Sequence, residues 1–141
     1  MKKLILPLVL YIMLFFSYQS ALADNETLII FDASLSMGQN LGDEPKFMIA
    51  SDIVKKYVSR MPQSEKIGLR IIGIELNTEL INYLKNPDAM CQSTRLEVPI
   101  SSNTAGIINE KLKYIIPLGI TPLVYSLNVS ILNDFSTDAD N

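Results

Sequence analysis

The residues best suited to chemistry lie in one short run, where an aspartate and two serines alternate as Asp32, Ser34 and Ser36. In an extended loop, alternate side chains point the same way, so one carboxylate and two hydroxyls can converge on one hard cation. Mg²⁺ suits this set best, because it binds one or two carboxylates, keeps several waters and prefers octahedral oxygen coordination; Mn²⁺ and Ca²⁺ are the alternatives. The structural interpretation is that the serines satisfy turn amides while Asp32 caps the loop.

The composition excludes most other kinds of site. The 141 residues contain no His and one Cys, which removes most zinc, haem and iron–sulfur sites and any Ser-His-Asp or Cys-His catalysis. We therefore expect a binding protein and not an enzyme. A metal-assisted hydrolase is the alternative enzyme class, but no lysine close to the loop supplies an acid–base partner. Cys91 would pair with a cysteine outside this chain or remain a buried free thiol.

The first 23 residues have the layout of a secretory signal peptide. Lys2 and Lys3 precede an apolar run over 4–16, and Ala21-Leu22-Ala23 offers a cleavage site. The run is too short for a membrane span, so we expect a secreted or periplasmic protein without a stable span after cleavage. The remaining domain, 24–141, has 10 basic and 15 acidic residues, a net charge of −5. This charge argues against a nucleic-acid partner.

Strands and helices are expected to alternate along 24–141. Short apolar runs predict strands, and apolar residues at helical spacing predict helices. The expected strands cover 27–31, 67–74 and 95–100, the last being an edge strand ended by Pro99. The expected helices run from Pro45 to Met61, from a cap at Asn103 or Thr104 to 116, and from Thr121 to Phe135. The stretch 75–90 is expected to be irregular, with a turn at 86–88.

This alternation predicts an α/β fold with a mainly parallel sheet. Ile49, Ile53 and Tyr57 recur at a spacing of four in the first helix and are joined there by Val54, Val58 and Met61. The last helix carries Leu123, Leu127 and Ile131. The Asp-Ser-Ser loop follows the first strand. In open α/β sheets, ligands bind outside the carboxyl ends of the strands, so the loop lies where a binding site is expected.

Two segments of the chain resemble the von Willebrand factor type A family. Residues 29–37, Ile-Ile-Phe-Asp-Ala-Ser-Leu-Ser-Met, resemble the first metal-binding loop of that family. Residues 119–123, Gly-Ile-Thr-Pro-Leu, resemble its second loop in the form common among bacterial members. The order and spacing of the two loops are also similar, and the resemblance spans about 27–135.

This resemblance implies a Rossmann-like, three-layer αβα fold and a metal-ion-dependent adhesion site. Ser34, Ser36 and Thr121 would offer hydroxyls to the cation, and Asp32 would hold it directly or through water. The open position would accept an acidic residue of a protein partner, so the implied role is adhesion or assembly by an exported, bacterial protein. Thr121 has a structural alternative, since threonine before Pro122 is also a good helix cap.

The chain departs from the family at its third loop. That loop carries an aspartate after a further strand, and nothing here supplies it. Asp134, Asp138 and Asp140 are expected to form a solvated, frayed end. The sequence therefore predicts a partial domain with its C-terminal strands missing and with weakened metal binding. The alternative to a binding module is a truncated fragment that binds nothing.

Overall fold

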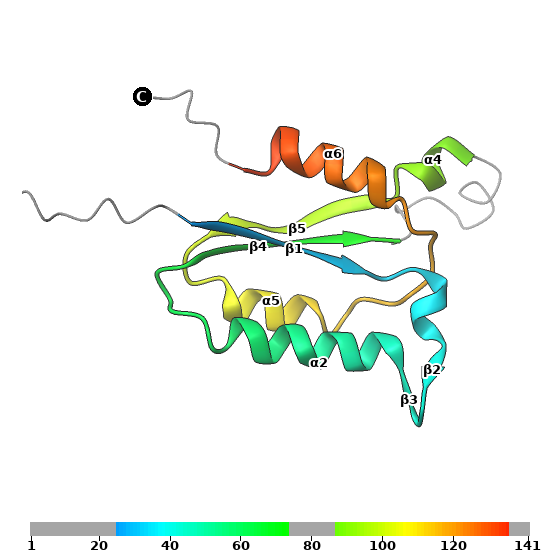
Figure 1. The fold of residues 1–141 in the computed structure, drawn as a ribbon, viewed down its shortest axis with the longest axis horizontal. Coiled ribbons are helices and arrows are strands. Elements are labelled where there is room, and N and C mark those ends of the chain that lie inside the picture. The colour runs from blue at the N-terminus through cyan, green and yellow to red at the C-terminus, as the bar shows by residue number, and fades with distance from the viewer. Residues whose placement is uncertain (1–24, 74–86, 136–141) are drawn as a thin grey trace, which may run out of the picture.

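Three strands form the central sheet, in the order β1 (Glu26–Asp32), β4 (Lys66–Ile72) and β5 (Thr94–Ser101) (Figure 1). The structure is a computed structural model that describes residues 25–73 and 87–135. Strand β4 lies in the centre, and six of its seven residues are buried, as its apolar sequence predicts. All three strands fall where the sequence places them, although 74 lies outside the described residues.

The strands β1 and β4 are parallel, and β4 and β5 are antiparallel. The parallel register joins Glu26 to Lys66 and Asp32 to Ile72, so both strands end at the same edge of the sheet. The expectation of a mainly parallel sheet thus holds for one of the two strand pairs described. Strand β5 continues past Pro99, which was predicted to end it. Pro99 is exposed on an edge strand, where a missing N–H group is tolerated.

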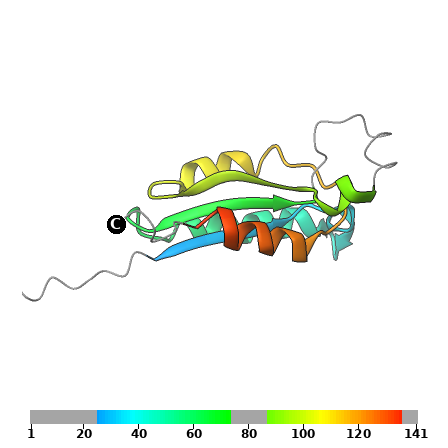
Figure 2. The ribbon, with the colours of Figure 1, turned by 90° about the horizontal axis from the view of Figure 1, so that it is seen from above.

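The helices α2 (Lys46–Val58) and α5 (Ala105–Lys111) cover one face of the sheet (Figures 1 and 2). The side chains packed between them and the sheet form the apolar core. These are mainly Phe31, Phe47, Val58, Leu69, Ile71, Val98, Ile108 and Leu112. Phe31 and Phe47 meet edge to face, with ring centroids 5.5 Å apart, a favourable aromatic arrangement.

The face that α2 buries agrees with the prediction only in part. Phe47, Ser51 and Val58 are buried and Val54 and Met61 pack against the core, whereas Ile53 and Tyr57 are exposed by 62% and 41%. At about 100° per residue, the row of Ile49, Ile53 and Tyr57 lies about 100–180° around the helix from Val58, so this row points away from the inward face. The buried stripe has spacings of four and seven residues, which stay on one side.

Helix α5 is shorter than the pattern of apolar residues predicts. It ends at Lys111, so Ile115 and Ile116 follow it in the connecting segment. Thr104 takes the predicted N-cap position but makes no cap bond there. Its hydroxyl donates instead to the carbonyl of Ile67 at 2.6 Å and so ties the helix start to β4.

Helix α6 (Leu123–Asn133) lies over the opposite face of the sheet (Figures 1 and 2). Its buried residues are Ser126 and Ser130, while the predicted apolar stripe faces outward. Leu123, Leu127 and Ile131 are exposed by 49%, 43% and 68%. The two serines therefore mark the buried side of the helix, and the leucine stripe lies away from it.

The remaining elements are short. A 3-10 helix, η1 (Leu35–Gly38), and a hairpin of β2 (Asn40–Leu41) and β3 (Glu44–Pro45) connect β1 to α2. Helix α4 (Pro87–Cys91) replaces part of the predicted irregular stretch and its turn, because Pro87 begins a helix well. The predicted leader, 1–23, lies outside the described residues. None of the helices within 25–73 and 87–135 is long and apolar enough to cross a membrane.

Candidate functional site

The Asp-Ser-Ser loop turns sharply at the carboxyl end of β1. Asp32 is the last residue of the strand, and its Oδ1 accepts the Ser34 amide at 2.8 Å. Ser34 is buried, Ser36 is exposed in η1, and their Oγ atoms lie 3.1 Å apart. The predicted capping of the loop by Asp32 is therefore confirmed for one of its two carboxylate oxygens. The two hydroxyls contact each other, although Leu35–Gly38 form a 3-10 helix and not the extended loop that was expected.

The second loop joins the first through the backbone. The Leu118 amide donates to the carbonyl of Ala33 at 3.1 Å, and the Leu35 amide donates to the carbonyl of Gly119 at 2.7 Å. Ser34 and Gly119 consequently form a parallel bridge. The Gly119 amide also donates to the carbonyl of Gly73, just after β4, at 2.6 Å. The segment 118–119 is thus inserted between the diverging ends of the two parallel strands.

Two glycines make this insertion possible. A Cβ atom on Gly119 would lie 2.4 Å from the Gly73 carbonyl oxygen, and a Cβ atom on Gly73 would lie 2.6 Å from the Ser34 nitrogen. Gly73 also has a φ of +78°, in the region that favours glycine. Residues with side chains would push the strands and the second loop apart. The glycine of the Gly-x-Thr-Pro-Leu segment therefore has a definite packing role.

Thr121 lies two residues beyond this bridge and is exposed. The N-cap of α6 is Pro122, and no side chain caps the helix there, so the predicted cap role of Thr121 is wrong. The carbonyl of Thr121, and not its hydroxyl, accepts the Leu123 amide at 2.9 Å. Thr121 also lines an open, largely apolar groove of about 530 Å³ along the first turn of α6.

The oxygen atoms of the first loop have a spacing that a small octahedral cation can use. Adjacent ligands at the Mg²⁺–oxygen distance of about 2.1 Å are separated by about 3 Å, which follows from a right angle at the metal. The Ser34 and Ser36 hydroxyls are 3.1 Å apart, a distance that a direct hydrogen bond also explains. Ca²⁺ has longer bonds, about 2.3–2.6 Å, but the smaller angles of its pentagonal-bipyramidal geometry give a similar separation, so this distance fits either cation.

Charge at this edge of the sheet comes from Asp32. In the described part of the chain, no basic side chain forms an ion pair with it, and Oδ2 accepts no bond. The same residues contain no cluster of three or more His, Cys, Asp or Glu side chains that would hold a metal. A cation bound here would therefore depend on one carboxylate, on hydroxyls and on waters.

A buried ion pair on the α6 face of the sheet was missed by the sequence analysis. Arg70 Nε and Nη2 donate to the two carboxylate oxygens of Asp134 at 2.6 and 2.7 Å. Only 6% and 2% of the two side chains are exposed, so the expectation that Asp134 is solvated is wrong. Asp138 and Asp140 lie outside the described residues. The sequence signal for this pair was an arginine inside an apolar strand, because such a charge requires a partner.

Cys91 is the last residue of α4 and lines the groove beside Thr121. It is exposed and forms no disulfide, so the predicted alternative of a buried thiol is wrong. The other alternative, a disulfide with a cysteine outside this chain, stays a prediction. An exposed thiol is geometrically able to form one.

Comparison with known proteins gives little direct information about function. No family model matches the chain. The chain is similar to a protein of Bacillus subtilis (strain 168) named Uncharacterized protein YwmD, with 29% identity over 105 residues. The match covers 74% of this chain and 45% of YwmD, so the chain spans about half the length of that relative.

Proposed function

We propose that this chain is a metal-ion-dependent protein-binding module of an exported protein. The observation that carries the proposal is the backbone bridge between Ser34 and Gly119. It brings together two loops that are 85 positions apart in sequence, and both carry hydroxyls of the predicted ligand set, Asp32, Ser34, Ser36 and Thr121.

The residues present fit a cation such as Mg²⁺ or Mn²⁺. Asp32 would supply charge through Oδ2, while Ser34 and Ser36 would supply neighbouring oxygens. Neutral hydroxyls reduce the charge of a cation little, so the bound metal would stay attractive to an added carboxylate. The partner would then be a protein that presents an acidic residue. The apolar groove beside Thr121 would contact the surroundings of that residue.

The finer features of the proposal come from the resemblance to von Willebrand factor type A domains. They include the three-layer αβα fold, the adhesion or assembly role and the secreted or periplasmic location that the predicted leader implies. The described β1, β4, β5 and the two flanking helix layers are compatible with part of such a fold. In this proposal, the family's third loop would have to come from outside the chain or be replaced by water.

Thermal unfolding of the purified protein with Mg²⁺, Mn²⁺ or EDTA tests the proposal. Metal that binds only the folded state raises the unfolding midpoint, and at 100 times Kd the gain is about 2.7 kcal/mol. The decisive variant is Asp32→Asn, which keeps an acceptor for the Ser34 amide but removes the charge. Asp52→Asn is the matched control, since Asp52 is an exposed aspartate of α2.

We expect a rise of the midpoint with metal in the wild type and in Asp52→Asn, and no rise in Asp32→Asn. A cooperative transition whose midpoint does not change with metal in any of the three proteins would contradict the proposal. Absence of any cooperative transition would favour the alternative of a truncated fragment that binds nothing. In that case the function would belong to a longer protein.

A further inference from the structure

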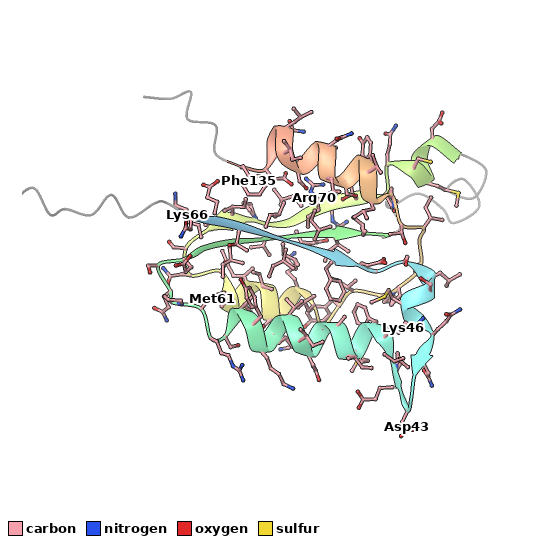
Figure 3. The ribbon with its side chains drawn as sticks, in the orientation of Figure 1. Asp43, Lys46, Met61, Lys66, Arg70 and Phe135 are labelled. Atoms are coloured by element: carbon pink, nitrogen blue, oxygen red, sulfur yellow. The ribbon has the colours of Figure 1, made fainter. Side chains whose placement is uncertain are left out.

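The contact between Arg70 and Asp134 anchors one end of α6 to the sheet. Arg70 extends from β4 toward α6, where Figure 3 labels it, and Asp134 is the C-cap residue of the helix. The two Arg70–Asp134 hydrogen bonds are parallel and charge-assisted, which is the strongest geometry for this pair. Arg70 Nη1 also donates to Thr94 Oγ1 on β5 at 3.2 Å. The guanidinium therefore links both strands to the helix.

The other contacts that hold α6 against the sheet are weak. Its inward residues, Ser126 and Ser130, bury little apolar surface, and the Ser130 hydroxyl has no hydrogen-bond partner among the described residues. The Ser126 hydroxyl donates to the Pro122 carbonyl, within the segment that leads into the same helix, and not to the sheet. Most apolar side chains of α6 are exposed by 39% to 74%, and only Val129 is half-buried. The ion pair is thus the strongest polar attachment that the described residues provide for this helix.

The segment 119–134 is attached to β4 at both ends. At one end the Gly119 amide donates to the carbonyl of Gly73, and at the other end Asp134 pairs with Arg70. Helix α6 connects the two attachments, and it is rigid over its 11 residues, about 16 Å. Thr121 lies between Gly119 and the helix. The position of Thr121 relative to the Gly119 bridge therefore depends on both attachments.

We propose that Arg70 and Asp134 are positioning residues for the metal site, because their ion pair fixes α6 and thereby holds Thr121 and the Gly119 bridge against Ser34. The effect of the ion pair on metal binding rests on the proposed function. Its effect on the backbone bridge between Ser34 and Gly119 does not depend on any metal. Neither residue would touch the cation or the partner.

Amide hydrogen exchange of the full chain tests the geometric aspect. Three amides report on the joined loops, namely Leu35, Leu118 and Gly119, because each donates across the junction. In Asp134→Asn we expect their protection to fall at least tenfold relative to the amides that pair β1 with β4. The comparison within one protein removes the effect of a general loss of stability.

Two further variants keep the test decisive. Glu97→Gln is the matched control, since the Glu97 side chain is 8% exposed and pairs with Arg95 within β5 and with Lys111 of α5, but with no residue of α6. Thr94→Val is the milder variant if Asp134→Asn does not fold, because it keeps the Arg70–Asp134 pair. It removes the third contact of the Arg70 guanidinium and the bond that the Thr94 hydroxyl donates to the Ile71 carbonyl. We expect selective loss of protection at the junction in Thr94→Val and not in Glu97→Gln.

Equal loss of protection at the junction and in the strands, or the same loss in Glu97→Gln, would overturn the inference. A Mn²⁺ titration under conditions where every variant is folded then addresses the site. We expect Asp134→Asn to weaken Mn²⁺ binding at least tenfold and Glu97→Gln to leave it unchanged. If the wild type binds no Mn²⁺, the proposed function fails, and the exchange data alone decide whether the ion pair positions the loop.

Discussion

Two aspartates at the ends of regular elements illustrate opposite uses of the same side chain. Asp32 ends β1, is partly exposed, and uses one carboxylate oxygen to accept the Ser34 amide. Asp134 follows α6, is 2% exposed, and uses both oxygens to accept from Arg70. The first carboxylate keeps an oxygen free for a ligand, whereas the second is fully satisfied. Exposure and remaining acceptor capacity therefore separate a candidate binding group from a structural one.

The two aspartates also differ in how much stability the protein would lose if either carboxylate were removed. A buried arginine without its carboxylate is an uncompensated charge, whereas a partly exposed aspartate leaves only one amide to be solvated. The Asp32 loop can therefore change with little loss of stability, and the Asp134 end of α6 cannot. The following variants test this contrast, beginning with the largest effect.

Asp134→Asn should lower the free energy of unfolding by about 3–5 kcal/mol, because Arg70 stays buried without its counter-charge. Urea denaturation at neutral pH measures this loss. The double variant Arg70→Met/Asp134→Leu should recover most of it, since apolar residues of similar volume often replace a buried pair without loss. If Asp134→Asn lowered the free energy of unfolding by less than about 1 kcal/mol, this ion pair would contribute no more than an ordinary surface pair.

Gly119→Ala should lower the free energy of unfolding by about 1–3 kcal/mol, since the new Cβ would meet the Gly73 carbonyl and the strands would have to shift. Gly106→Ala is the matched control. Gly106 is exposed in α5, and a Cβ added there would meet no atom within 4 Å, so alanine should stabilise the helix by up to about 1 kcal/mol. Equal effects of the two variants would contradict the tight junction between the strand ends and the second loop.

Ser36→Ala should weaken Mn²⁺ binding about tenfold, equivalent to about 1.4 kcal/mol, if its hydroxyl is a ligand. Ser36→Thr keeps the hydroxyl and should retain binding. Because Ser36 is exposed, neither variant should shift the unfolding midpoint measured in EDTA. Isothermal titration with Mn²⁺ gives the affinities, and identical affinities in alanine and threonine variants would remove Ser36 from the ligand set.

Lys113→Ala should have the smallest effect on stability. Lys113 donates a hydrogen bond to Glu110, and this bond together with the positive charge lowers the pKa of the Glu110 carboxyl. A lowered folded-state pKa stabilises the protein above the ordinary pKa, and this contribution is lost as the pH falls through the lowered value. Both groups are exposed, so solvent screens the pair. An NMR titration should show the pKa of Glu110 rising in the variant, with unfolding at neutral pH unchanged.

The sequence predicts the regular elements better than the surfaces they bury. The apolar runs that became β1 and β4 predict strands, although only β4 is buried along nearly its whole length, while β1 has one buried and six partly buried residues. Helices α2 and α6 were also expected, but the inward face of α2 was predicted only in part and that of α6 was not. On α6 the buried residues are Ser126 and Ser130. No local sequence pattern predicts that serines and not leucines would be buried on this helix.

In the candidate site too, local features can be predicted from the sequence, and contacts between distant segments cannot. The Asp-x-Ser-x-Ser run is local, so its convergence follows from the chain geometry of one loop. The junction with Gly119 depends on the spacing of two strand ends, which the chain fixes only after it folds. The Arg70–Asp134 pair joins residues 64 positions apart. The buried charge of Arg70 predicts that a partner exists, but one sequence does not say which of several acidic residues it is.

The outer edge of β1 has a consequence for how the protein behaves in concentrated solution. Among the described strands β1 pairs only with β4, along an uninterrupted register, and its sequence contains no proline and no basic residue. Proteins usually interrupt such edges to prevent self-association. Strand addition here would require no unfolding, because the strand is already extended. Oligomer formation should therefore rise with protein concentration and stay insensitive to mild heating.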